Sequence, residues 1–176
     1  ATVVDVIQVD NQDGNRVCKV KLSMPRELGI GDKFSSRHGQ KGMTGGGYSA
    51  GKMPFTSSGL VIDFVLNVHA IPTRMTIGQL LEGNFAKSHA WKGTSGDATI
   101  FRDTDDVAAC NMLEKLGFDR YGCERVFIGH TGEWIDVPLF VTPVFYQRLQ
   151  KFVKEEVYSI STGPTCIITR QPLEGK

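Results

Sequence analysis

The sequence predicts an α+β fold that is mainly β, with about three helices packed on a barrel-like sheet. Several runs of β-branched and apolar residues are typical of strands. The 176 residues include 20 glycines, which favours numerous turns over a helical bundle. Other segments repeat apolar residues at helical spacing and carry capping residues at their ends. We expect one domain over residues 1–176, because no internal repeat or low-complexity linker divides the chain.

The first 66 residues are expected to form strands and a long loop. The runs "TVVDVIQV" and "VCKVKLS" alternate apolar and polar residues, and Asp13-Gly14 between them suits a tight hairpin turn. A glycine- and serine-rich stretch at 42–59 indicates an extended loop. The following run "LVIDFVL" at 60–66 is apolar apart from Asp63, which predicts a buried strand.

Two helices are expected in the middle of the chain. Thr76 can cap a short helix, and residues 86–103 look irregular. The expected apolar side of this helix consists of Ile77, Leu80 and Leu81. The segment 103–118 is the better amphipathic helix, with acids at its N-terminal end and Gly117 as its C-cap. Its apolar face is expected to consist of Ala108, Met112 and Leu116.

The last third of the chain predicts two strands, a helix and a final strand. Strands at 125–130 and 134–141 are joined across "HTGE", and "TCIITR" at 165–170 reads as a strand. Residues 142–157 predict a helix that begins with Thr142 as N-cap and Pro143. Its buried stripe would be Phe145, Leu149, Phe152 and Val153. On this helix Arg148 and Lys151 would lie on a solvated face.

The run "GDKFSSRHGQKG" at 31–42 is the first candidate binding site. The net charge of the chain is only +1, but residues 33–52 contain four cations and no acid. These cations are Lys33, Arg37, Lys41 and Lys52. Alternate positions from 33 to 41 share one face of an extended strand, and the glycines let backbone approach a polyanion closely. Lysine and arginine without acidic partners suit phosphates, although a solvated basic loop would show the same pattern.

Other motifs limit the chemistry. Gly46-x4-Gly51-Lys52 imitates a phosphate-binding P-loop, but Met53 replaces the magnesium-binding Ser or Thr and Pro54 prevents the helix. Arg74 precedes a predicted helix N-terminus, which is typical either of an anion site or of a surface arginine near a cap. The scattered cysteines and carboxylates show no zinc or magnesium pattern, and no apolar run is long enough to span a membrane. The chain is therefore expected to hold phosphates but not to activate a metal-bound nucleophile.

An ordered series of motifs carries a family resemblance. The series is "GDKFSSRHGQKG", "MPFT", "NVHAIPTRMTIGQLLE", "GHTG", "YQRL", "STGP" and "TRQPLEGK". It closely resembles the C-terminal part of the second-largest, β-type subunit of multisubunit DNA-dependent RNA polymerase, in its nuclear or archaeal form. That subunit is several times longer, so we expect this chain to be a fragment. The resemblance implies a hybrid-binding domain that contains a double-psi β-barrel, facing a sister barrel in the largest subunit.

The resemblance also implies roles for individual residues. The two active-centre lysines of the family fall on Lys33 and Lys41, and the arginine that reaches the triphosphate of the incoming nucleotide falls on Arg74. These three are the expected catalytic residues. The residues expected to bind nucleic acid are Arg37, His38, Gln40 and Lys52. The implied Mg²⁺ is held by aspartates of the largest subunit, not by this chain.

The resemblance further implies the surroundings of the chain. The expected partners are the largest subunit, small assembly subunits, DNA template, RNA transcript and nucleoside triphosphates, without a membrane. The expected location is the nucleus, or the cytoplasm or virion for an archaeal or viral enzyme. Departures from the family, such as Glu156 and Tyr158 in place of its lysine and histidine, indicate a divergent lineage. The alternative function is a stand-alone single-stranded nucleic-acid-binding module, with Tyr48 and Phe55 stacking on bases.

Overall fold

Short strands and helices confirm the predicted α+β class. Within the residues that it describes (1–102, 104–157, 159 and 161–173), the computed structural model has three α-helices and nine strands. The quoted positions Tyr158 and 174–176 lie outside these ranges. The helices are α1 (Ala70–Arg74), α2 (Ile77–Lys92), α3 (Asp106–Lys115) and the 3-10 turns η1 (Ala50–Lys52) and η2 (Val153–Glu155). The strands are β1 (Thr2–Asp10), β2 (Arg16–Ser23), β3 (Lys33–Ser36), β4 (Gly42–Met43), β5 (Phe55–Thr56), β6 (Cys123–Glu124), β7 (Val126–Phe127), β8 (Leu139–Phe140) and β9 (Tyr146–Arg148).

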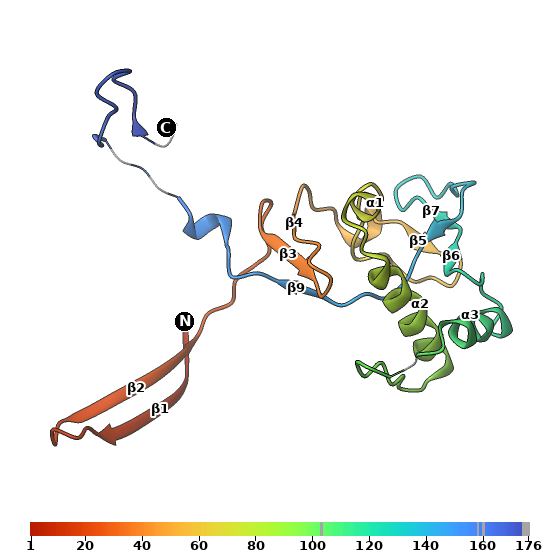
Figure 1. Cartoon of the computed structure of the whole chain (residues 1–176), viewed down its shortest axis with the longest axis horizontal. Helices are drawn as coiled ribbons and strands as arrows, with labels where there is room; N and C mark the ends of the chain where they lie inside the picture. Colours follow the sequence, from red (N-terminus) through yellow and green to blue (C-terminus); the bar gives the residue numbers. More distant parts are fainter. Residues whose placement is uncertain (103, 158, 160, 174–176) are drawn as a thin grey trace.

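The N-terminal hairpin forms as predicted. β1 and β2 pair antiparallel from Thr2 opposite Ser23 to Asp10 opposite Arg16, with one bulge after Val3. Gly14 in the turn has a φ of 77°, a left-handed conformation that glycine adopts without steric cost. The hairpin is exposed along its whole length and extends away from the rest of the chain (Figure 1).

The basic run at 31–42 folds into a second hairpin within the central sheet, whose strand order is β4-β3-β9. Phe34 lies opposite Gly42 on β4 and opposite Arg148 on β9. Residues 37–39 form the turn between β3 and β4. Lys33 therefore lies on the outgoing strand and Lys41 immediately before the returning strand, so the alternating cations do not share one continuous strand.

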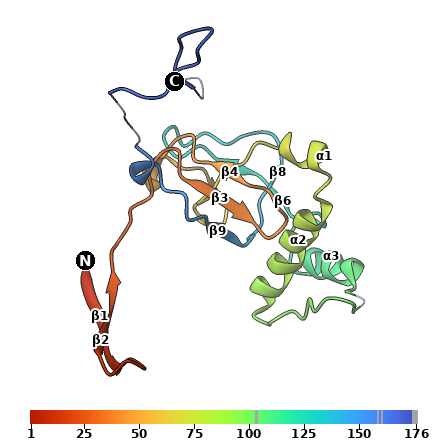
Figure 2. The same ribbon diagram turned by 60° about the vertical axis from the view of Figure 1, so that its left-hand side comes forward.

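The predicted helix at 103–118 is confirmed as α3, with a shifted buried face. The Asp105 side chain caps it by accepting a hydrogen bond of 2.8 Å from the backbone N–H of Ala108. The buried residues are Ala109 and Leu113, one position beyond the expected Ala108 and Met112. α3 packs against the C-terminal half of α2, so the two helices form the helical side of the body (Figure 2).

The helix that begins after Thr76 is longer than predicted and buries a different face. α2 extends to Lys92, so the expectation that 86–92 are irregular was wrong. Its buried positions are polar or small, namely Gln79, Gly83, Lys87 and Ser88. Two of the three residues on the expected apolar side are exposed, Ile77 at 62% and Leu81 at 41%, and Leu80 is half-buried. Polar contacts therefore hold α2 against the sheet.

Three predicted elements were wrong. Residues 142–157 do not form a helix, because Tyr146–Arg148 pairs with β3 as β9 and only η2 follows. The run 60–66 is not a buried strand, since Val61 alone bridges to Phe55 and most of its apolar side chains are exposed. Residues 165–170 form a turn closed by a bridge between Thr165 and Pro172 instead of a strand.

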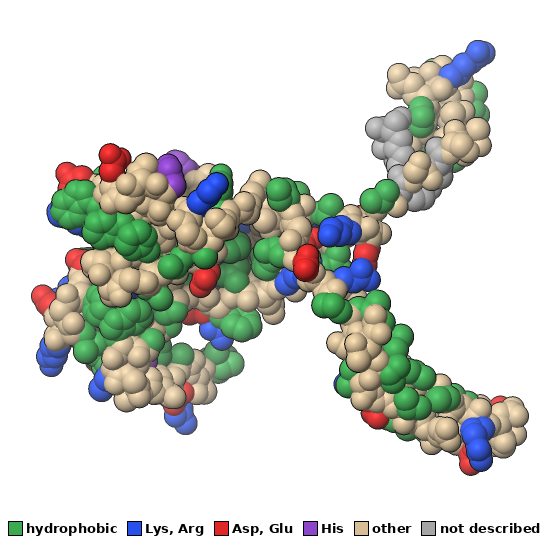
Figure 3. Space-filling view, turned by 180° about the vertical axis from the view of Figure 1, so that it is seen from behind, with side chains coloured by type: hydrophobic (Ala, Val, Ile, Leu, Met, Phe, Trp, Pro, Cys, Tyr) green, Lys and Arg blue, Asp and Glu red, His purple; other side chains and the backbone are tan. Residues whose placement is uncertain are grey.

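The described residues leave an unusually large apolar surface uncovered. Their sheets are four small antiparallel units, and no closed barrel is formed among them. The accessible surface is 13774 Å², against about 8,500 Å² for a compact monomer of this mass. The buried hydrophobic side chains of the described part are Ala109, Leu113 and Val126. Hydrophobic side chains line the projecting hairpin and much of the body surface (Figure 3).

Candidate functional site

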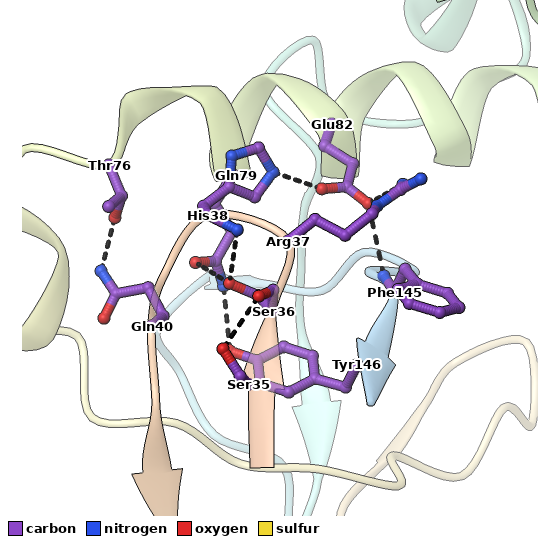
Figure 4. Close-up of polar contacts among 10 residues, drawn as sticks. All are labelled: Ser35, Ser36, Arg37, His38, Gln40, Thr76, Gln79, Glu82, Phe145 and Tyr146. Atoms are coloured by element: carbon purple, nitrogen blue, oxygen red, sulfur yellow. Dashed lines mark hydrogen bonds and ion pairs between the residues drawn. The ribbon is translucent and has the colours of Figure 1, made fainter. Parts of the chain in front are cut away.

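One face of α2 holds the strip, by which we mean residues 33–41. Thr76, Gln79 and Glu82 follow one another at intervals of three, so they share a face of the helix and its cap. Each contacts a different part of the strip (Figure 4). The middle contact is Gln79, which accepts from the Ser36 hydroxyl at 3.5 Å and donates to the Tyr146 hydroxyl at 3.1 Å.

Glu82 is the acidic partner that the local sequence of the strip lacks. One carboxylate oxygen accepts from Arg37 and the other contacts His38 Nε2. The Arg37 guanidinium also lies 5.0 Å from the centre of the Phe145 ring. The expectation that the cations of the strip have no acidic partner is therefore wrong for Arg37. Arg37 and His38 serve first to attach the turn to α2.

The environment of Glu82 keeps it ionised. Burial alone would raise its pKa, but hydrogen bonds from Arg37 and His38 and from the backbone N–H of Phe145 outweigh burial, and the pKa of Glu82 lies below its ordinary value of 4.5. The side chain is 15% exposed. A carboxylate at this position offsets positive charge at the turn, which leaves the excess charge of the strip at its two ends.

Gln40 and Arg74 bring two distant motifs together. The Gln40 amide is buried, and its nitrogen donates to the Ala70 carbonyl at 3.1 Å and to the Thr76 hydroxyl. Arg74 at the end of α1 donates to the Gln40 side-chain oxygen at 3.1 Å and to the Lys41 carbonyl at 3.3 Å. Arg74 is therefore placed beside Lys41, although 33 positions separate them.

The lysines of the strip are differently placed from Arg37. Lys33 is partly exposed and Lys41 is exposed, and within the described part of the chain neither forms an ion pair with a carboxylate. Lys33 lies opposite Met43 in the register of β3 and β4. Lys41 precedes Met43 by two positions, and side chains two apart along an extended strand project to the same face. Lys52 lies apart, in η1, whose backbone packs against Gly129.

Comparison with known protein families identifies the chain. All of residues 1–176 match the family model described as RNA polymerase Rpb2, domain 6. The chain belongs to the Rpb2 domain 6 family. This confirms the resemblance to the second-largest subunit that the ordered motifs indicated.

Relatives of this Rpb2 domain 6 chain come from eukaryotes, archaea and viruses. DNA-directed RNA polymerase II subunit 2 of Arabidopsis thaliana is 45% identical over 99% of the chain. DNA-directed RNA polymerase subunit 2 of Acanthamoeba polyphaga mimivirus is 40% identical over 97%, and subunit Rpo2 of Saccharolobus shibatae 39% over 99%. The chain spans only 14% to 16% of the length of these three relatives.

Sequence reasoning missed a second group of buried polar contacts in the Rpb2 domain 6 chain, which is centred on Lys87. Lys87 on α2 is 0% exposed and donates to the Gly122 and Val141 carbonyls at 3.1 and 2.9 Å, and to the Glu124 carboxylate. Its ammonium also lies 5.0 Å from the centre of the Phe118 ring. Lysine is rarely buried without partners, and because residues 86–103 were expected to be irregular, no predicted helix face indicated that Lys87 is buried.

One further polar residue was assigned to the wrong environment. Arg148 was expected on a solvated helix face but is largely buried, and it pairs with Asp32 at 2.6 Å. Asp32 and Arg148 each lie in a quoted motif, "GDKFSSRHGQKG" and "YQRL", but neither motif indicates that the two residues pair. In the described residues, no helix of the Rpb2 domain 6 chain is long and apolar enough to cross a bilayer.

Proposed function

We propose that this chain forms part of the active centre of a DNA-dependent RNA polymerase. It would position the RNA 3′ end, the RNA–DNA hybrid and the phosphates of the incoming nucleotide during nucleotidyl transfer. The convergence of Arg74 on Lys41 carries the proposal, because it joins two cationic motifs into one surface. Family membership supplies the context, since the relatives are polymerase subunits by name.

The strip offers the groups that phosphates require. In nucleotidyl transfer the RNA 3′ hydroxyl attacks the α-phosphate and pyrophosphate leaves, so negative charge accumulates at the site. Lys33 and Lys41 supply point charges, and the fork of Arg74 retains donors beyond the Nη1 that it uses on Gln40 and Lys41. Fixed cations of this kind orient the reactants and offset charge that develops on the leaving phosphates.

Arg37, His38 and Gln40 have a more indirect role in this proposal. Their side chains are engaged by Glu82, Thr76 and Ala70, so they fix the shape of the turn that faces the hybrid. Arg37 is 61% exposed despite its pairing and can still present charge to a nucleic-acid backbone. Lys52 belongs to the proposal as a separate phosphate contact at the edge of the glycine-rich loop.

The donor set of the strip does not fit a metal ion. Its polar side chains are lysine, arginine, histidine, serine and glutamine, with no carboxylate among them, whereas Mg²⁺ takes carboxylate, carbonyl and phosphate oxygens. No step of the mechanism is therefore assigned to a metal on this chain, and the proposed Mg²⁺ belongs to the largest subunit. The double-psi barrel is likewise proposed for the assembled subunit, where further strands would complete the open sheets.

The alternative of a stand-alone nucleic-acid-binding module has weaker support. Phe55, one of its two proposed stacking residues, is already stacked on Phe127 with ring centres 5.2 Å apart. Tyr48 is 75% exposed. The module would give the isolated chain tight, salt-sensitive RNA binding. The polymerase function instead requires the assembled enzyme and predicts weak binding by the chain alone.

The test is nucleotide addition by the assembled polymerase that carries the full subunit. Lys33→Ala, Lys41→Ala and Arg74→Ala should each slow addition by on the order of 10²-fold at subsaturating nucleotide, without loss of assembly. Lys115→Ala, at the exposed end of α3, is the matched control and should leave the rate unchanged. Full-speed addition by all three variants would refute the proposed function.

A further inference from the structure

A buried carboxylate lies directly beside Lys33. Asp32 is 3% exposed, and its Oδ2 accepts from Arg148 Nη2 at 2.6 Å and from the Gly29 N–H at 2.8 Å. Its Oδ1 accepts from the Val153 N–H at 3.1 Å. The hydrogen bonds from Gly29, Val153 and Arg148 hold the pKa of Asp32 below its ordinary value of 3.8. Each described partner of this carboxylate is a donor.

Arg148 extends the contact to the segment that leads out of the N-terminal hairpin. Its Nη1 donates to the Arg26 carbonyl at 2.6 Å and its Nη2 to the Glu27 carbonyl at 3.1 Å. The guanidinium also lies 4.5 Å from the centre of the Phe152 ring. Acidic and basic side chains gather where the N-terminal hairpin and the C-terminal segment join the body (Figure 3). The Asp32–Arg148 pair therefore joins residues 26–29, the start of β3 and the end of β9.

The backbone of Lys33 is held from both sides at this junction. The Lys33 carbonyl accepts from the Leu149 N–H at 2.9 Å, next to Arg148 on the chain. On the other side, the Asp32 carbonyl accepts from the Thr44 N–H at 3.0 Å. Because Asp32 and Arg148 anchor these neighbours, the point from which the Lys33 side chain projects depends on their pairing.

We propose that the Asp32–Arg148 pair is a positioning device for Lys33, and that it sets where the Lys33 ammonium meets the phosphates of the polymerase substrates. The inference rests on the proposed function of Lys33. Asp32 and Arg148 do not contact substrate in this scheme and act through Lys33. A displacement of about 1 Å in a positioning group can cost on the order of 10²-fold in rate, so a loose junction is expected to slow addition substantially.

The sharpest perturbation is Asp32→Asn in the full subunit of the assembled polymerase. The amide keeps the shape of the carboxylate, but either orientation turns an NH₂ group toward a backbone or guanidinium donor. We expect kcat/KM for nucleotide addition to fall by about 10-fold to 10²-fold. Asp10→Asn is the matched control, because it removes the same charge from a carboxylate that is 76% exposed on the projecting hairpin and pairs with Arg16 at 3.8 Å, and it should leave kcat/KM unchanged.

A double-variant comparison separates positioning from a general loss of structure. If Asp32 acts through Lys33, adding Asp32→Asn to Lys33→Ala should cost less than about twofold more. Arg148→Lys keeps the positive charge without the fork, so it should give an intermediate loss that also disappears on the Lys33→Ala background. This second variant decides the matter if Asp32→Asn prevents assembly.

Each result has one meaning. Two results would overturn the positioning role and leave the proposed function intact. One is that the losses in rate multiply in the double variants. The other is that Asp32→Asn and Arg148→Lys both add nucleotides at full speed while Lys33→Ala is slow. Full-speed addition by Lys33→Ala would overturn the role of Lys33 and the positioning role together.

Discussion

Replacing Lys87 with methionine should loosen α2 from the strands that it covers. The substitution keeps the length and most of the volume of the side chain and removes only the ammonium. That group is fully buried and serves three acceptors, the Gly122 and Val141 carbonyls and the Glu124 carboxylate. All three would lose a donor at once, in a region where Glu124 is only 10% exposed.

The expected size of the effect follows from this burial. Removing one partner of a buried ion pair costs about 3–5 kcal/mol, mainly because the other charge stays buried without compensation. Lys87→Met should therefore destabilise the contact between α2 and β6 by about this amount. Adding Glu124→Gln removes the uncompensated charge, so the double variant should recover part of the loss even though no pair is restored.

Native-state hydrogen exchange in the assembled polymerase measures this loss locally. Amide protons in the second half of α2 and in β6 should exchange at least about 10²-fold faster in Lys87→Met. Lys92→Met changes an exposed lysine at the end of the same helix and should leave exchange unchanged. If Lys87→Met exchanged no faster than Lys92→Met, the lysine would not hold α2 and the reasoning from burial would be wrong.

Two further predictions concern the turn of the strip and the glycine-rich loop. Because the folded-state pKa of Glu82 lies below 4.5, its stabilising contribution is complete above that pH and is lost as the pH falls through the lower value. The difference in urea midpoint between the native chain and Glu82→Gln should thus narrow as the pH falls from about pH 5 toward about pH 3. A difference in midpoint that stays constant over this range would contradict the pairing. Gly129→Ala would place a Cβ 2.3 Å from the Met53 carbonyl oxygen, so it should cost about 1–3 kcal/mol and speed proteolysis of loop 44–53. Gly47→Ala is the control, because its Cβ meets open space and should not speed proteolysis of the loop. Equal rates of proteolysis in both variants would rule out the clash.

The cationic strip could be predicted from the sequence, but its acidic partner could not. The spacing of Lys33, Arg37 and Lys41 is local and was visible directly. Glu82 lies 45 positions from Arg37 and at a helical position that looks solvated in a linear pattern. Only the packing of α2 on the turn brings the two together. A local excess of charge therefore indicates a candidate site but not the division between paired and unpaired cations.

The failed helix at 142–157 shows how tertiary pairing overrides a local pattern. Thr142, Pro143 and the spacing of the apolar residues all favoured a helix. In the structure, Tyr146–Arg148 instead hydrogen-bonds to β3, and Arg148 gains Asp32 as a partner. Pairing with a distant strand carries no signal in local periodicity. The N-terminal hairpin and α3 were predicted correctly because a turn glycine and a capping aspartate specify them locally.

The spacing of Thr76, Gln79 and Glu82 also has a mechanical consequence. Directional hydrogen bonds fix a helix in one rotational and axial setting, because each weakens steeply when its distance or angle is disturbed. A rotation of α2 about its axis by the angle between successive residues would break the contacts of Thr76, Gln79 and Glu82 with the strip at the same time. Any rearrangement of the turn at 37–39 that keeps these bonds must therefore carry α2 with it, so the turn and the helix move as one unit.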